Sequence, residues 1–378
     1  MKQKFSFIFL TAFVLLSGAF LSCAKKIQKQ SLPELEGLTY SHTLETKYAK
    51  AFRADFYGES AILLTVSDSD RYLLVPESQE VSQNLPADIK IINYPVQNTY
   101  LAATSAMSFF ARLNSLDLLK FSSIKKKDWY IDDAVTAMQN GSIIYAGKYN
   151  APDFELLIDK KCPLAIESTM IYHSPQISEK LEALGITVFV DKSSYEEHPL
   201  GRLEWIKVYG LLSGKLPEAE DFFDKQIQSL PDKKNKSTHS RPLAAFFYVT
   251  PSGMVVIRGS DDYIVKMMEM AGASYVFSDI KKSRSPSIQI SIEQFYAKAA
   301  EADILIYNSS IDNTIRSKQD LIIKNPLFAD FKAVKTNKVW VTGSYIYQAT
   351  DKIGEIILDL QNIMEDKTDE LEFLKNLE

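Results

Sequence analysis

The sequence has few of the residues that hold metal ions or form covalent cross-links. Only two of its 378 residues are cysteine and only four are histidine. The histidines show no metal-binding spacing, and they stand at His42, His173, His198 and His239. Because local zinc sites need closely spaced Cys and His pairs, this pattern argues against a zinc site. Cys162 lies in an apolar stretch and is predicted to be a small core residue.

The common motifs of nucleotide-binding and hydrolytic enzymes are missing as well. In "GSIIYAGKY" (141–149) five residues separate the glycines, and Tyr149 stands where a phosphate loop needs Ser or Thr. No G-x-G-x-x-G follows a predicted strand, and no G-x-S-x-G elbow occurs. The acidic pairs at 132–133 and 261–262 stand at predicted helix starts, where they favour the helix dipole. The sequence therefore favours a binding protein over an enzyme.

The first 22 residues predict a secretory signal peptide. Lys2 and Lys4 precede an apolar run that small residues close, and the run is short for a membrane span. An uncleaved anchor helix is the alternative. "AFLSC" (19–23) resembles a bacterial lipoprotein cleavage motif, with Phe20 at a position where leucine is usual. On this resemblance Cys23 becomes the acylated first residue, and residues 23–39 form a polar tether to a membrane.

Composition and charge narrow the class of protein further. Hydrophobic residues make up 46% and charged residues 24% of the chain, which is typical of a soluble globular protein. Removal of residues 1–22 leaves 41 basic and 48 acidic side chains, a net charge of −7. This balance argues against a nucleic-acid partner, which needs a basic face. The length fits two domains.

Strand and helix patterns alternate along most of the chain and predict an α/β protein. "AILLTV" and "RYLLVP" flank turn residues and predict a hairpin, and "IKIINYP" predicts a further strand. Apolar residues at helical spacing predict one long helix over 99–119. A helix followed by a buried strand is predicted at 152–168 and again at 291–310. Such alternation predicts parallel sheets covered on both faces.

The predicted arrangement is two Rossmann-like lobes with parallel sheets, joined by a long helix, with a ligand cleft between them. "EEHPLGRLEWIKVYGLLSG" (196–214) has almost no polar face, so its helix is expected to be buried or clasped between two bodies. We therefore predict an N-terminal lobe at 40–197, an interlobe helix at 198–230 and a C-terminal lobe at 241–365. Residues 366–378 are predicted to form a charged tail.

These segments resemble those of the ABC-transporter substrate-binding proteins for iron–siderophore complexes, haem and cobalamin. The resemblance runs from about Tyr40 to Leu360 and is most specific in "EEHPLGRLEWIKVYGLLSG". "GSIIYAGKYNAPDFELLIDKKCPLAIES" and "SIEQFYAKAAEADILIY" are similar to the family segments that each carry a docking glutamate. "MMEMAGASYVF" is similar to the family's "AGG"-type helix ending, with Ala273 in place of one glycine.

The resemblance implies that Glu155 and Glu293 lie at the top of one lobe each and pair with arginines of the permease dimer. Bidentate guanidinium–carboxylate pairs would make such docking specific. Taken singly, each glutamate has a simpler explanation in a first helical turn, and Ser291 with Gln294 forms a capping box around Glu293. The matched pair in the family's own segments favours the docking role.

Ligands of open α/β sheets bind beyond the carboxyl ends of the strands, and this rule selects loop residues. Aromatic rings and arginines there would suit a flat, often anionic metal chelate. The predicted ligand-binding residues are Trp129, Arg258, Tyr130, Tyr100, Tyr172 and Tyr345, with further candidates at Thr104, Ser105, His173, Asn308 and Tyr347.

The resemblance implies an extracytoplasmic lipoprotein, in the periplasm or on a cell surface, that passes an iron–siderophore, haem or cobalamin complex to an ABC permease. We expect a monomer with no catalytic residues, no cofactor and no metal bound directly by the protein. Two alternatives stay open. A binder of free zinc or manganese would need converging His and carboxylate ligands, and a secreted α/β enzyme would need a nucleophile with a base or an open metal site.

Overall fold

The structure is a computed structural model that describes residues 35–67, 69–79, 84–230, 241–281, 285, 287–368 and 371–378. The predicted signal peptide, Cys23 and most of the predicted tether (23–39) lie outside these residues. Residues 36–378 form one compact unit. We call its part before residue 198 the N-terminal lobe and its part after residue 240 the C-terminal lobe.

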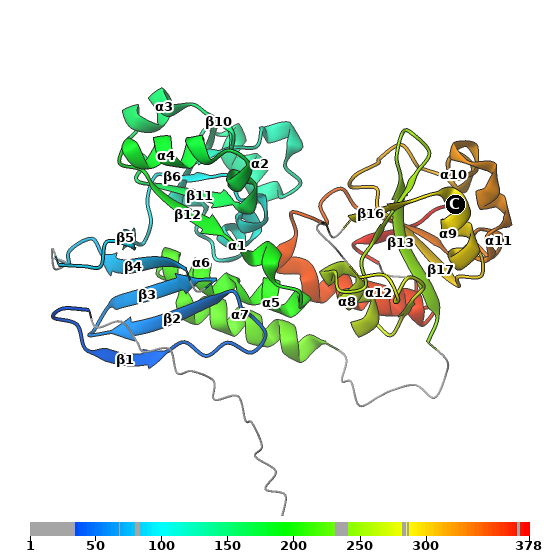
Figure 1. Cartoon of the computed structure of the whole chain (residues 1–378), viewed down its shortest axis with the longest axis horizontal. Helices are drawn as coiled ribbons and strands as arrows, with labels where there is room; N and C mark the ends of the chain where they lie inside the picture. Colours follow the sequence, from blue (N-terminus) through cyan, green and yellow to red (C-terminus); the bar gives the residue numbers. More distant parts are fainter. Residues whose placement is uncertain are drawn as a thin grey trace, which may run out of the picture. The chain divides into compact units, whose positions relative to one another are not determined.

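The N-terminal lobe begins with a five-stranded sheet, which we call the N-terminal sheet (Figure 1). Hairpin turns make its first four strands antiparallel, and only β4 and β5 run parallel. The predicted hairpin is confirmed as the β3–β4 pair, and the predicted strand at 89–95 is confirmed as β5. The order follows the sequence: β1 (Tyr40–Thr43), β2 (Phe52–Tyr57), β3 (Ala61–Val66), β4 (Asp70–Pro76) and β5 (Ile89–Tyr94).

The second sheet of the N-terminal lobe is parallel throughout, as the alternation predicted. Its order is β12-β11-β6-β7-β8. The strands are β6 (Thr99–Leu101), β7 (Leu119–Ser122), β8 (Ile144–Tyr145), β11 (Leu164–Ser168) and β12 (Thr187–Asp191). Between them lie α1 (Met107–Arg112), α2 (Asp132–Gln139), α3 (Phe154–Asp159), α4 (Pro175–Ala183) and the short pair β9 (Gly147–Lys148) and β10 (Ala151–Pro152).

The long helix predicted over 99–119 is wrong. That stretch holds β6, the short helix α1 and the start of β7. All three residues of β6 are buried, so the strand is as continuously buried as a core helix. Periodicity cannot separate these two cases over so short a run. The chain turns at Asn114, whose φ of +50° ends the helical path.

The predicted interlobe segment is helical but consists of three helices in succession. These are α5 (Pro199–Glu204), α6 (Ile206–Ser213) and α7 (Leu216–Ser229). Gly214, with a φ of +69°, ends α6 in the left-handed conformation that glycine adopts without strain. All eight residues of α6 are buried, which confirms that this stretch has almost no polar face.

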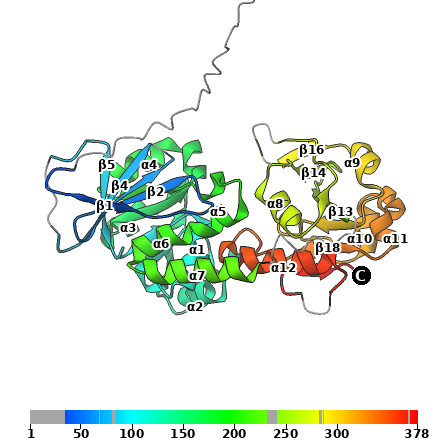
Figure 2. The ribbon, with the colours of Figure 1, turned by 90° about the horizontal axis from the view of Figure 1, so that it is seen from below.

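The C-terminal lobe is built on one mixed sheet in the order β16-β14-β13-β17-β18-β19, with β15 paired to β13. Its strands are β13 (Leu243–Val249), β14 (Val255–Arg258), β15 (Ser274–Tyr275), β16 (Ser287–Ile290), β17 (Ile304–Tyr307), β18 (Val339–Thr342) and β19 (Leu374–Asn376). Its helices are α8 (Tyr263–Met270), α9 (Ile292–Ala299), α10 (Lys318–Lys324), α11 (Lys332–Lys335) and α12 (Ile353–Met364). Helix α12 contacts α5, α7 and α8, and Figure 2 shows it running from beside α7 toward β18.

Single turns of 3₁₀ helix occur in the connections of both lobes. They are η1 (Thr104–Ala106), η2 (Leu116–Leu118), η3 (Lys126–Asp128), η4 (Thr169–His173), η5 (Ser193–Tyr195), η6 (Pro326–Asp330) and η7 (Thr350–Lys352).

The predicted charged tail at 366–378 is corrected by β19, which pairs antiparallel with β18 at the edge of the sheet. Phe373, Leu374 and Leu377 are buried in the core. The carboxylate of Asp359 accepts the backbone N–H groups of residues 372, 373 and 374 at 3.0, 2.5 and 3.2 Å. The many charged residues of this stretch suggested a tail, but its three buried apolar side chains are enough to pack an edge strand against the core.

Candidate functional site

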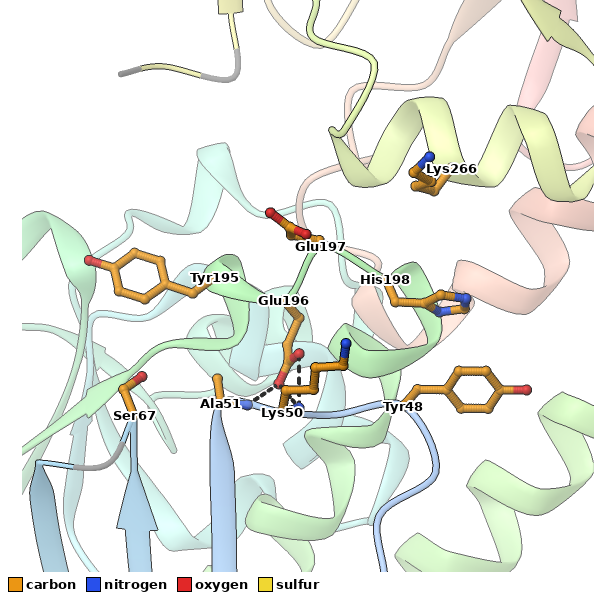
Figure 3. Close-up of a pocket in the computed structure, with 9 residues that line it drawn as sticks. All are labelled: Tyr48, Lys50, Ala51, Ser67, Tyr195, Glu196, Glu197, His198 and Lys266. Carbon is orange, nitrogen blue, oxygen red and sulfur yellow. Dashed lines mark hydrogen bonds between the residues drawn. The ribbon is translucent and has the colours of Figure 1, made fainter. Parts of the chain in front are cut away.

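A pocket of about 490 Å³ lies where three parts of the chain meet (Figure 3). The N-terminal sheet contributes Ser67 and the loop before β2, and the segment between β12 and α5 contributes residues 195–198. Lys266, on α8 of the C-terminal lobe, also lines the pocket. A volume of this size is within the usual range of small-molecule sites. The pocket is therefore the candidate ligand site.

Two buried carboxylates hold the loop before β2 in place. Glu204, which is completely buried on α5, accepts the backbone N–H groups of residues 47, 48 and 49 at 2.7 to 3.0 Å. Glu196 accepts those of Lys50 and Ala51 at 2.7 to 3.1 Å. Five consecutive backbone donors thus bind two side chains. Buried carboxylates require such satisfaction, because an unpaired buried charge is strongly destabilising.

Each of these carboxylates has a further partner on the interlobe helices. Lys207, which is also buried, donates to Glu204 at 2.9 Å. The indole Nε1 of Trp205 donates to Glu196 at 3.2 Å. The loop is therefore tied to α5 and α6 by a fully connected polar network, which fixes the position of its side chains.

His198 stands at the point where the pocket meets the start of α5. Its Nδ1 accepts the backbone N–H of Leu200 at 3.1 Å and so caps the helix. Its ring stacks on Tyr48, with ring centroids 4.7 Å apart. Because Nδ1 is an acceptor, the proton of the neutral ring lies on Nε2.

Arg202 joins the interlobe segment to the C-terminal lobe beside the pocket. Its guanidinium donates to the backbone oxygens of Ser194 and Glu196 at 2.7 and 3.0 Å. It also lies 3.6 Å from the ring centroid of Tyr263 on α8, which is a close cation–π contact. Burial raises the pKa of the Tyr263 hydroxyl, so this ring stays neutral. Tyr263 is one turn before Lys266, so the contact also positions the C-terminal wall of the pocket.

Arg258 lies in a polar cluster inside the C-terminal lobe. Its side chain is 11% exposed, donates to the Tyr347 hydroxyl and lies 3.9 Å from the Asp262 carboxylate. The Asn308 amide also donates to the Tyr347 hydroxyl at 2.8 Å. The structure thus brings together three of the sequence-derived candidates, Arg258, Asn308 and Tyr347, but as partners of one another.

Two of the predicted aromatic residues pack inside the lobes, and a third is partly buried. Trp129 is 4% exposed and donates from its indole to Ser122 at 3.2 Å. Tyr100 is completely buried and donates to the Gly147 carbonyl at 3.1 Å. Tyr345 donates to the carbonyl of residue 372 at 3.1 Å. The positions of Trp129 and Tyr100 argue against direct ligand contact, because little or none of these two rings reaches the surface.

Two predicted aromatics are half-exposed. Tyr130 is 50% exposed, and its backbone N–H donates to Gln348 of the C-terminal lobe at 2.8 Å. Tyr172 is 49% exposed, with the Lys192 ammonium 5.8 Å from its ring centroid. Neither these two nor the other predicted ligand residues line the pocket. A ligand role for Tyr130 and Tyr172 stays a prediction.

The residues that build the pocket wall were missed at the sequence level. Tyr48 and Lys50 lie in a loop without a motif. One signal for this wall was present in the sequence: Glu196 lies just before, and Glu204 lies within, an almost wholly apolar helical stretch. Acids in such a place need partners, and the partners turned out to be backbone groups about 150 residues away.

Glu155 and Glu293 occupy matching places, each exposed in the first turn of its helix, α3 and α9. Asp153 caps α3, and the predicted capping box of Ser291 and Gln294 is confirmed at α9, with hydrogen bonds of 3.3 and 3.0 Å. A hydrogen bond from the Ser291 hydroxyl lowers the pKa of Glu293. Both helices are thus capped by other residues, which leaves the two glutamates without a structural task in capping.

Two features are absent from the part of the chain that the structure describes. Within these residues no three or more His, Cys, Asp or Glu side chains are arranged to hold a metal ion. No helix in the described part of the chain has the length and apolar character needed to cross a membrane.

Comparison with known proteins identifies the family. The sequence profile of the periplasmic binding proteins matches residues 115–346. An uncharacterized lipoprotein of Methanocaldococcus jannaschii is 26% identical over 343 residues, which cover 84% of this chain and 81% of that protein.

Two solved structures are similar in fold. A periplasmic haem-binding protein of Pseudomonas aeruginosa has a TM-score of 0.59 at 15% identity, over 75% of this chain and 98% of that one. A periplasmic vitamin B12-binding protein of Vibrio cholerae has a TM-score of 0.51 at 16% identity, over 73% of this chain and 99% of that one. The predicted α/β fold and the family resemblance are confirmed. Because the profile match spans more than half of the sequence, this chain belongs to the periplasmic binding protein family.

Proposed function

We propose that this chain is an extracytoplasmic lipoprotein that binds an iron–siderophore, haem or cobalamin complex in the pocket and delivers it to an ABC permease. The observation that carries the proposal is the pocket itself, whose lining combines residues of the N-terminal lobe, the interlobe segment and α8. In an α/β binding protein, a pocket of about 490 Å³ at such a junction is suited to a small solute.

Contacts between the lobes favour capture in a largely preformed pocket. Besides the Arg202–Tyr263 contact, Arg112 on α1 pairs with the Asp351 carboxylate at 2.8 Å. The Gln348 amide donates to the Asp128 carbonyl at 2.9 Å. With α5 to α7 forming the connection, closure by a wide hinge motion would break these contacts. Spin labels on the two lobes should therefore change their separation little on ligand binding, and a change of many ångströms would contradict this mechanism.

Delivery requires that the loaded protein dock on the permease in one orientation. We assign this task to Glu155 and Glu293, which would each pair with an arginine of one permease subunit. Exposed ion pairs contribute only about 0–1 kcal/mol each, so the two pairs would set the orientation more than the affinity. A lipid on Cys23 would keep the protein at the membrane that holds the permease.

Ligand binding to the chain from residue 24 onward tests the proposal. Ferric siderophores, ferric haem and cobalamin are titrated by calorimetry, and we expect one class to bind with a Kd of about 1 µM or lower. Lys266→Glu should weaken that binding, because Lys266 lines the pocket. The matched control is Lys335→Glu on α11, since both lysines lie on C-terminal helices and pair with a nearby carboxylate. Binding of no member of the panel would overturn the proposal.

A further inference from the structure

The N-terminal sheet lies outside the part of the chain that the family profile matches. Its five strands span 40–94, whereas the match begins at residue 115. Yet four of the nine residues that line the pocket, Tyr48, Lys50, Ala51 and Ser67, belong to this sheet or to the loop that enters it. The match to the family profile therefore says nothing about a role of this sheet in ligand binding.

The loop that supplies this wall is held rigid in advance. Its five consecutive N–H groups bind Glu196 and Glu204, and the Tyr48 ring stacks on His198. Glu204 lies on α5 and Glu196 lies just before this helix, so the wall keeps its position relative to the rest of the pocket. A wall ordered before binding loses little entropy when a ligand arrives, which favours affinity and selectivity.

Lys50 is the cationic side chain that this wall presents. Figure 3 shows it extending from the loop toward the side of the pocket that α8 closes. Its ammonium makes no hydrogen bond or ion pair with any residue that the structure describes. The nearby lysines differ, since Lys47 pairs with Asp224 at 2.6 Å and Lys266 pairs with Glu269 at 2.9 Å. Of the two lysines that line the pocket among the described residues, Lys50 is thus the one whose charge a ligand could satisfy.

We propose that the N-terminal sheet is a specificity element of the pocket and that Lys50 selects ligands carrying an anionic oxygen. Such an oxygen, a carboxylate or a catecholate for example, would form a charge-assisted hydrogen bond with the ammonium. This inference rests on the proposed function and narrows its ligand class from metal chelates in general to anionic chelates. Glu204 acts as a positioning residue, because it binds the loop and does not line the pocket, whereas Glu196 both binds the loop and lines the pocket.

The test compares anionic with uncharged probes. The anionic probes are ferric haem, with its two propionates, and a ferric tricatecholate; the uncharged probe is a neutral ferric trihydroxamate. Calorimetry on the wild-type chain and on Lys50→Met, Lys50→Arg and Lys47→Met gives Kd at low and high salt. Lys47→Met is the matched control, because Lys47 is in the same loop but does not line the pocket.

An anionic probe should bind best, and Lys50→Met should weaken it about tenfold or more, as expected for loss of a charged hydrogen bond. The salt dependence of Kd should fall with the same substitution. Lys50→Arg should retain most of the affinity, and Lys47→Met should leave it unchanged. Thermal unfolding of each variant checks that Lys50→Met is folded.

Two results would overturn the inference while leaving the proposed function intact. One is wild-type binding of an anionic probe that Lys50→Met does not weaken, and the other is preferential binding of an uncharged probe. If no probe binds the wild-type chain, the proposed function falls and this inference falls with it.

Discussion

Glu167 provides a quantitative test of the fold, because its carboxyl group is buried without a partner. It is the fourth residue of β11 and is completely buried. Neither of its carboxyl oxygens has a hydrogen-bond partner within the residues that the structure describes. Burial raises the pKa of this group from 4.5 to about 8. The folded protein therefore keeps Glu167 protonated at neutral pH, whereas the unfolded chain ionises it.

The direction of the pH effect follows from this difference in proton binding. Below pH 4.5 both states hold the proton, and the group does not change stability with pH. As pH rises from 4.5 to about 8, only the folded state keeps the proton, so the free energy of unfolding falls. The slope reaches about 1.4 kcal/mol for each pH unit only where the unfolded chain is ionised and the folded one is protonated. It is smaller close to about pH 5 and about pH 8, so the loss between these two values is roughly 3 kcal/mol.

The substitution Glu167→Gln removes this titration while keeping the shape of the side chain. Urea unfolding of both proteins, followed by circular dichroism between about pH 5 and about pH 8, gives the two stability curves. The wild-type curve should fall by roughly 3 kcal/mol more than the variant curve over this range. Other buried acids, such as Asp191 and Asp351, are present in both proteins and cancel in the comparison. Parallel curves would show that Glu167 is ionised and has a partner in the folded protein, which would refute the reasoning.

Three further predictions address the pocket wall, the backbone and docking. Glu204→Ala should destabilise the protein by about 3–5 kcal/mol in urea unfolding, because it leaves the buried Lys207 ammonium without its carboxylate partner and three backbone N–H groups without their acceptor. Gly147→Ala should lower the thermal midpoint, since its φ is +85° and a Cβ there would collide with the Ala151 carbonyl, at a cost of about 1–3 kcal/mol. The double variant Glu155→Lys, Glu293→Lys should bind ligand normally but should abolish uptake through the permease.

Each of these predictions has a control in the same chain. Glu218→Ala changes an exposed acid in the first turn of α7 and should alter stability by less than about 0.5 kcal/mol. Gly141→Ala has a similar φ of +81° but no atom within 4 Å of the new Cβ, so it isolates the steric clash at Gly147. Glu179→Lys, an exposed reversal on α4, should leave uptake intact. Equal effects in a variant and its control would contradict the corresponding prediction.

Local patterns were enough to predict the class of fold. The β3–β4 hairpin, the β11 and β17 strands and the capping box of α9 all depend on residues within a few positions of one another. Alternation of such units leads to parallel sheets by geometry alone. The long helix predicted over 99–119 was wrong because a short buried strand and a buried helix have similar compositions. The edge strand β19 was not predicted, because a few apolar residues among many charged ones are a weak signal for a strand.

The sequence by itself determined that this protein has an α/β fold with two matching helix–strand units, because periodicity and capping act over short distances along the chain. Only the tertiary structure decided where a ligand could bind. The pocket exists because Glu196 and Glu204 accept hydrogen bonds from backbone groups about 150 residues earlier, and because Arg202 meets Tyr263 on another lobe. Every non-proline residue has the same backbone N–H donor, so no side-chain pattern in the sequence could predict which donors bind these two carboxylates.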